Sequence, residues 1–127
     1  MATKEALAFE RTLFNVEQLR WVNRIILVSA DQQSEAEVIS RLRQAKSKID
    51  ERHLLWFVFS AERLTSNYEG EISQSFVRDI HHKYFNNQVK FVLIGKDGGI
   101  KDQQPVLRLN STLALIDTMP MRQSETK

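Results

Sequence analysis

Unbroken runs of hydrophobic residues mark three buried strands in this chain. Residues 25–28 read IILV, residues 53–60 contain six consecutive apolar residues, and residues 91–94 read FVLI. Branched and aromatic side chains in such short runs favour β-strands. The second run has no polar face, which is typical of a central strand that is covered on both sides.

Hydrophobic residues at three- and four-residue steps predict helices between and after these strands. Residues 34–49 form the first helix, which starts at an S-x-x-E capping box of Ser34 and Glu37. Residues 72–85 form the second helix and residues 109–119 the last. The polar segment before the second helix is expected to be a loop.

The two ends of the chain are expected to lie outside the main domain. Residues 1–20 form a lead-in segment, in which the capping-box spacing of Asn15 and Gln18 predicts a short helix. The last helix ends at a proline, and residues 123–127 are interpreted as a flexible polar tail. Residues 21–122 are therefore predicted to form one domain, as suits a chain of this length.

A charged, glycine-rich turn joins the third strand to a fourth. Residues 95–100 read GKDGGI, and Asp-Gly and Gly-Gly supply the positive-φ positions that a tight hairpin demands. This pattern predicts an antiparallel β-hairpin late in the chain.

The predicted element order is β-α-β-α-β-β-α, which is the plan of a thioredoxin-like fold. A strand, a helix and a second strand form a right-handed unit with parallel strands, and the hairpin and closing helix complete the domain. We expect an α/β domain with a mixed sheet of about four strands and helices on both faces. A flavodoxin-like fold is the alternative, but it needs a further strand and helix in place of the hairpin.

Composition excludes several classes of chemistry. The chain has no cysteine, which removes disulfides, thiolate metal sites and thiol redox catalysis. Its 18 basic and 16 acidic residues are interleaved, whereas a nucleic-acid-binding protein usually has a clustered basic stripe. No apolar run approaches the roughly 18 residues of a membrane span. The first residues lack the apolar core of a signal peptide. The location is left open between periplasmic or secreted, if a leader was removed, and cytoplasmic otherwise.

Four short motifs resemble a known family. They are WVNR at residues 21–24, DER at 50–52, GKDGGIK at 95–101 and IDTMPMR at 116–122. Together they are similar to the domain of unknown function numbered 4174, over residues 21–123. The resemblance implies a thioredoxin-like fold related to peroxiredoxins and a set of exported or extracellular relatives, and it implies no assigned activity.

Thioredoxin chemistry itself is not expected. The nucleophile of that fold follows the first strand at the start of a helix, where the helix dipole lowers the pKa of a thiol. Here residues 29–34 read SADQQS, which contains no thiol. The substrate-side proline of the fold should precede the third strand, and residues 86–90 contain none.

The predicted topology brings the four motifs to one pole of the domain, opposite the redox end. Three roles are open for the charged residues there. They could form an ion-pair network that pins the strand ends and the last helix, or a recognition site whose guanidinium forks grip an anionic group or a partner, or an acid/base site at Asp97 or Asp117. The candidate residues are Arg24, Arg52, Lys96, Asp97, Lys101, Asp117 and Arg122.

We expect a binding or interaction module, without cofactor or metal, whose partner is an unknown protein or a small anionic ligand. The alternatives are a non-thiol enzyme that uses the charged pole and a non-catalytic partner in a redox or stress-response system. His81 and His82 are adjacent on a helix and point about 100° apart, so they do not predict a metal site. The first helix also has a basic face, interpreted as exposed surface with an anionic partner as the alternative: Arg41, Arg43, Gln44, Lys46 and Lys48.

Overall fold

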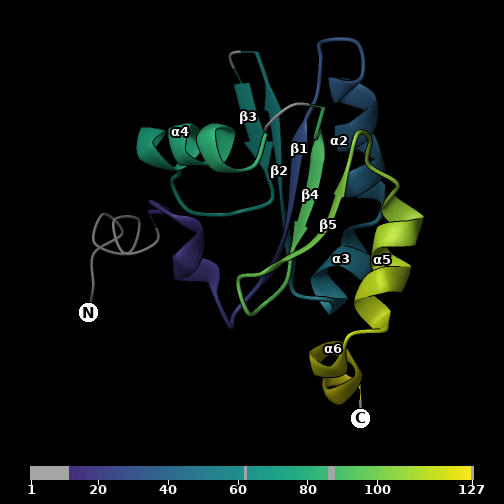
Figure 1. The fold of residues 1–127 in the computed structure, drawn as a ribbon. Helices are drawn as coiled ribbons and strands as arrows, with labels where there is room; N and C mark the ends of the chain where they lie inside the picture. The colour runs from purple at the N-terminus through teal and green to yellow at the C-terminus, as the bar shows by residue number, and fades with distance from the viewer. Residues whose placement is uncertain (1–11, 62, 86–87, 127) are drawn as a thin grey trace.

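A five-stranded mixed sheet forms the centre of the computed structural model, which describes residues 12–61, 63–85 and 88–126 (Figure 1). The strand order is β3-β2-β1-β4-β5. The strands are β1 (Arg24–Ser29), β2 (Leu54–Ser60), β3 (Arg63–Ser66), β4 (Phe91–Ile94) and β5 (Ile100–Gln104).

Helices cover both faces of this sheet. One face carries α2, α3 and α5, the other carries α4 and the short 3-10 helix η1, and α6 lies beyond the end of α5 (Figure 1). The bounds are η1 (Val16–Leu19), α2 (Glu35–Gln44), α3 (Lys46–Glu51), α4 (Gln74–Lys83), α5 (Leu109–Asp117) and α6 (Pro120–Glu125). None of the helices in the described part of the chain is long and apolar enough to cross a membrane.

Strand pairing confirms the predicted topology. β1 runs parallel to β2, with Ile26 opposite Trp56, and antiparallel to β4, with Ile26 opposite Leu93. β5 returns antiparallel beside β4 through the glycine-rich turn, in which Gly98 has a φ of 85°. The chain therefore has a parallel pair followed by an antiparallel hairpin, as in a thioredoxin-like sheet.

Two hydrophobic cores lie on opposite faces of the sheet because successive strand residues point to opposite sides. Ile26 of β1 and Trp56 of β2 face the core beneath α2, α3 and α5. Ile25 and Phe57 face the core beneath α4 and η1, where Phe57 and Phe76 rings lie 5.1 Å apart. The uninterrupted apolar run in β2 is thus explained by cover on both sides.

The short helix in the lead-in segment is confirmed, with its capping box. Asn15 accepts from the backbone N–H of Gln18, and the Gln18 side chain accepts from the backbone N–H of Asn15. Leu13 forms an isolated bridge to Ile72, which ties the segment to the chain before α4. Residues 1–11 of the predicted lead-in lie outside the described residues.

Three local predictions are wrong. The segment 61–71, expected to be a loop, contains strand β3, whose pairing with β2 is continued by the Asn67 side chain: its Oδ1 accepts from Trp56 N at 2.8 Å. The first helix is divided at Ala45 into α2 and α3. Ser34 does not cap it; instead the carboxylate of Asp31 accepts from the backbone N–H of Ser34 at 2.8 Å.

Residues 123–125, predicted to begin a flexible tail over residues 123–127, belong to helix α6, and residue 127 lies outside the described residues. Pro120 is the first residue of a further helix, α6, and not the start of an unstructured tail. Proline is tolerated at the first helical position because the backbone N–H that it lacks would have no partner within the helix. The helix continues to Glu125, whose carboxylate contacts Arg24 at the start of β1, while Arg122 of the same helix contacts Asp117 at the end of α5.

Candidate functional site: the charged pole

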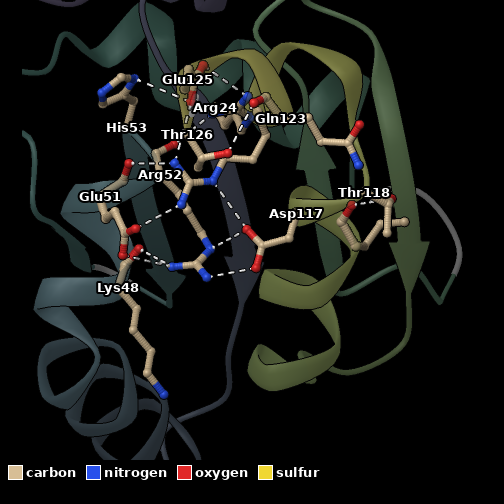
Figure 2. Close-up of polar contacts among 12 residues, drawn as sticks. Arg24, Lys48, Glu51, Arg52, His53, Asp117, Thr118, Gln123, Glu125 and Thr126 are labelled. Atoms are coloured by element: carbon tan, nitrogen blue, oxygen red, sulfur yellow. Dashed lines mark hydrogen bonds and ion pairs between the residues drawn. The ribbon is translucent and has the colours of Figure 1, made fainter.

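Charged side chains from five elements meet where β1 and β2 begin (Figure 2). The group, called the charged pole below, comes from the start of β1, the end of α3 with the residues that follow it, the turn after β4, the last residue of α5, and α6. Its members are Arg24, Glu51, Arg52, His53, Lys96, Asp117, Arg122 and Glu125.

Glu125 holds one half of the charged pole together. Its two carboxylate oxygens accept from Nη1 and Nη2 of Arg24 at 3.1 and 3.2 Å, a bidentate fork. Lys96 Nζ donates to Oε2 of the same carboxylate at 2.6 Å and lies 2.7 Å from Nδ1 of His53. Arg24 is 1% exposed and Lys96 8%, so this carboxylate compensates two buried cations.

Asp117 holds the other half. Arg52 donates from Nε and Nη2 to its two oxygens at 3.0 and 2.8 Å, and Arg122 Nε donates to Oδ1 at 3.2 Å. Arg122 also donates to the backbone oxygen and the carboxylate of Glu51, at 3.2 and 3.0 Å. The last residue of α5 is thereby bound to the end of α3 and to α6.

Two carboxylates of the charged pole, Glu125 and Asp117, are held ionised. Partial burial acts to raise the pKa of Glu125, but the hydrogen bonds from Arg24 and Lys96 outweigh it and lower that pKa to about 2. The hydrogen bond from Arg52, followed by that from Arg122, lowers the pKa of Asp117 despite the opposing effect of burial. Both groups are therefore anionic at neutral pH.

Two of the predicted site residues lie outside this network. Lys101 Nζ donates to Asp97 at 2.9 Å, and Asp97 also accepts from the backbone N–H of Gly99 at 2.9 Å. The Lys101 contact and the Gly99 hydrogen bond lower the pKa of Asp97. This pair stabilises the hairpin turn itself. The structure brings together the other five candidates: Arg24, Arg52, Lys96, Asp117 and Arg122.

The cations of the charged pole, its arginines and its lysine, are all paired with carboxylates of the same chain. Among the described residues, no buried side-chain nitrogen or oxygen lacks a hydrogen-bond partner. The same part of the chain contains no group of three or more His, Asp or Glu side chains placed to hold a metal ion.

The sequence interpretation missed His53 and Glu125, and of these, Glu125 contacts two buried cations. Its signal was the proline two residues before Arg122, which marks the first position of a new helix as readily as the end of an old one. A helix starting at Pro120 places Arg122 and Glu125 three residues apart on one side of the helix. There Glu125 contacts Arg24 at the start of β1, and Arg122 contacts Glu51 and Asp117.

The opposite end of the sheet, where thioredoxin-like catalysts carry their thiol, has a small cleft of about 320 Å³. Val28, Ala30, Pro105 and Val106 supply apolar walls. The hydroxyl of Ser34 donates to Asp31 at 2.9 Å, and no histidine lines the cleft. The cleft thus lacks both a thiol and a serine–histidine pair.

Arg122→Ala tests the structural role of the charged pole. Arg122 is buried, but its partners Glu51 and Asp117 are largely solvent-accessible and regain water when it is removed. We expect the free energy of unfolding to fall by about 1–2 kcal/mol, seen as a lower midpoint in urea denaturation. Unchanged stability with loss of a ligand or partner would instead assign Arg122 to recognition.

Comparisons with known proteins agree with the fold and give no activity. The model of the family described as domain of unknown function (DUF4174) matches residues 15–125. A crystal structure of the reduced 2-Cys peroxiredoxin of Plasmodium vivax superposes with a TM-score of 0.56 at 15% identity, covering 88% of this chain and 85% of that one. No curated protein shows significant sequence similarity to the chain. The chain therefore has a thioredoxin-like α/β fold and carries none of the cysteines on which thiol chemistry depends.

Proposed function

The chain belongs to the DUF4174 family of domains of unknown function, and from this premise we propose that it is a non-catalytic protein-interaction module. The surface that we assign to the partner is the exposed edge of the charged pole at Trp21 and Val22, just before β1. The single observation that carries the proposal is the backbone conformation and exposure of Trp21.

Trp21 is held in a conformation that a bulky side chain rarely adopts. Its φ is 70°, in the left-handed region, which costs about 1–3 kcal/mol for a residue other than glycine. The side chain is nevertheless 59% exposed, and that of the neighbouring Val22 is 62% exposed. Strain of this kind, maintained to present two apolar side chains to solvent, is typical of a functional surface.

The surroundings fix this conformation. The backbone N–H of Trp21 donates to the carbonyl oxygen of Lys96 at 2.6 Å. The guanidinium of Arg20 lies 5.0 Å from the centre of the Trp21 ring, and the Arg20 side chain packs over Gly98 of the hairpin turn. His53, directly before β2, also has a positive φ, of 52°, and is hydrogen-bonded to Lys96 through its ring.

In this proposal the charged residues position the surface and the apolar ones contact the partner. The network around Glu125 holds Lys96, and Lys96 holds both strained residues. A groove of about 570 Å³ continues from Val22 past His53 to Leu55 and Tyr68, which extends the surface. A preorganised tryptophan beside such a groove resembles the central anchors of protein–protein interfaces.

The exchange Trp21→Gly separates strain from function. Glycine adopts a φ of 70° without steric cost, so the variant is expected to keep or raise its melting temperature. The same variant is expected to lose at least about tenfold in partner affinity, because aromatic anchors contribute about 2 kcal/mol or more to an interface. Circular dichroism and a binding titration measure the two effects.

The partner for that titration is found by comparative capture. Immobilised wild-type protein, Trp21→Gly and Val106→Ala are exposed to the same native extract, and the bound proteins are quantified by mass spectrometry. Val106 is an exposed apolar residue at the opposite end of the sheet, which makes it a matched control. A captured protein is then purified and titrated; equal affinity for wild type and Trp21→Gly would refute the proposal.

A further inference from the structure

A groove lies between the α2–α3 helices and the start of α5, on the face of the sheet opposite α4. It has a volume of about 610 Å³, within the roughly 300–1,000 Å³ of small-molecule sites. One wall is formed by residues 41–48 and the other by residues 107–111. This groove is separate from the Trp21 surface and shares no lining residue with it.

The lining of the groove is basic and contains no carboxylate. Three cations reach it, Arg41 and Lys48 from the helices and Arg108 from the residue before α5. Arg41 pairs with Glu37 on the exposed side of α2, at 2.8 Å. Within the described residues, Lys48 and Arg108 take part in no ion pair. Figure 2 shows the Lys48 side chain extending away from the charged pole, to which it contributes only its backbone oxygen.

This arrangement is the reverse of that at the charged pole. There, Arg24, Lys96 and Arg122 are buried and each contacts a carboxylate of the chain. In the groove, two cations from opposite walls face a common space without a counter-charge. Positive charges that line a cavity raise the local concentration of anions. The groove therefore favours an anionic ligand, whereas the charged pole, whose cations are already paired, does not.

Neutral groups in the groove narrow the class of ligand. Hydroxyl and amide donors also line the groove, from Ser47, Ser111, Asn110 and Gln44, and Ala45 and Leu107 offer apolar contact. A phosphate group has a double charge and several oxygens that accept from such donors at once. The apolar wall suits the organic part of a ligand.

We propose that this groove binds a small organic phosphate, with Lys48 and Arg108 as the main contacts from its two walls. The basic face of residues 41–48 is then one half of a binding site that α5 completes. The inference does not depend on the protein-interaction proposal, because the two surfaces are lined by different residues.

The test is a titration of the ¹⁵N-labelled protein, followed by NMR, with AMP and glucose 6-phosphate, and with adenosine and glucose as their uncharged counterparts. We expect saturable shifts at the amides of Ser47, Lys48, Asn110 and Ser111 with the phosphates alone. Lys48→Gln and Arg108→Gln should each weaken binding about fivefold, as expected for one partly solvated charged contact.

Arg78→Gln is the matched control, because Arg78 is an exposed cation of α4 on the other face of the sheet. It loses the same charge and should leave the affinity unchanged. The proposal fails if no saturable shifts appear, if Arg78→Gln weakens binding as much as the groove variants, or if single-stranded RNA binds where the small phosphates do not. The last result would assign the groove to a polyanionic partner.

Discussion

Glu125→Ala is expected to lower the free energy of unfolding by about 3 kcal/mol, because breaking a buried ion pair leaves an uncompensated charge. Here one truncation leaves two buried cations, Arg24 and Lys96, without their shared carboxylate. Arg24 is 1% exposed, and among the described residues its guanidinium then keeps only the carbonyl oxygen of Arg52 as a partner. Urea denaturation followed by the fluorescence of the buried Trp56 measures the loss.

Glu37→Ala is the control for this prediction. Glu37 also pairs with an arginine, Arg41, but both side chains are about two-thirds exposed on α2. Exposed pairs at this helical spacing contribute only about 0.3–0.5 kcal/mol. Equal effects of Glu37→Ala and Glu125→Ala would show that residues 123–127 behave as the flexible tail that their composition suggests.

Acidification from about pH 4.5 to about pH 2 is expected to remove the contribution of Glu125 from the wild-type protein. The folded-state pKa is about 2 and the usual value is 4.5. Because the folded pKa is depressed, the contribution is fully present above about pH 4.5 and is lost as the pH falls through the folded pKa. At about 1.4 kcal/mol per pKa unit, the difference corresponds to about 3 kcal/mol.

The comparison that isolates this carboxylate is Glu125→Gln. Glutamine does not titrate, so the stability of the variant should fall less than that of the wild type across the same pH range, and the two should converge near pH 2. The lowered pKa values of Asp117 and Asp97 add acid sensitivity of the same sign to both proteins. A constant gap between wild type and variant from pH 6 to pH 2 would contradict the assignment.

The fold was predictable because its main signals are local. Six apolar residues in a row in β2 require cover on both sides, and the glycines after β4 require a tight turn. These two features, with the amphipathic segments between them, are sufficient to order the strands of a thioredoxin-like sheet. The family model and the peroxiredoxin structure agree with that fold.

What the sequence did not reveal depends on weaker or distant determinants. β3 is four residues long and lies at the sheet edge, so no hydrophobic run marks it. The break at Ala45 falls on the best helix-forming residue type, and composition therefore gives no sign of it. The start of α6 is marked by Pro120, but the ion pairs of Arg122 with Glu51 and of Glu125 with Arg24 join residues far apart in the sequence. No local pattern encodes those contacts.

The meeting of Arg24, Arg52, Lys96, Asp117 and Arg122 followed from topology, whereas their pairing did not. A strand direction fixes which ends of elements lie together, but the partner of each side chain depends on distances of a few ångströms. Asp97 and Lys101 illustrate the difference, since Asp97 lies in the turn, Lys101 lies near the start of β5, and they form an ion pair with each other. Among the described residues, neither forms an ion pair with a member of the charged pole. The groove between the α2–α3 helices and α5 could not be predicted either, because its two walls are about 60 residues apart in the sequence.

The fork between Arg24 and Glu125 joins residues 101 positions apart. During synthesis, β1 and its arginine leave the ribosome long before the carboxylate that neutralises that arginine exists. A nascent chain that folds its sheet early would enclose a bare cation, so the sheet gains full stability only after α6 has emerged. Chains interrupted before residue 125 are thus expected to be preferred substrates for proteolysis.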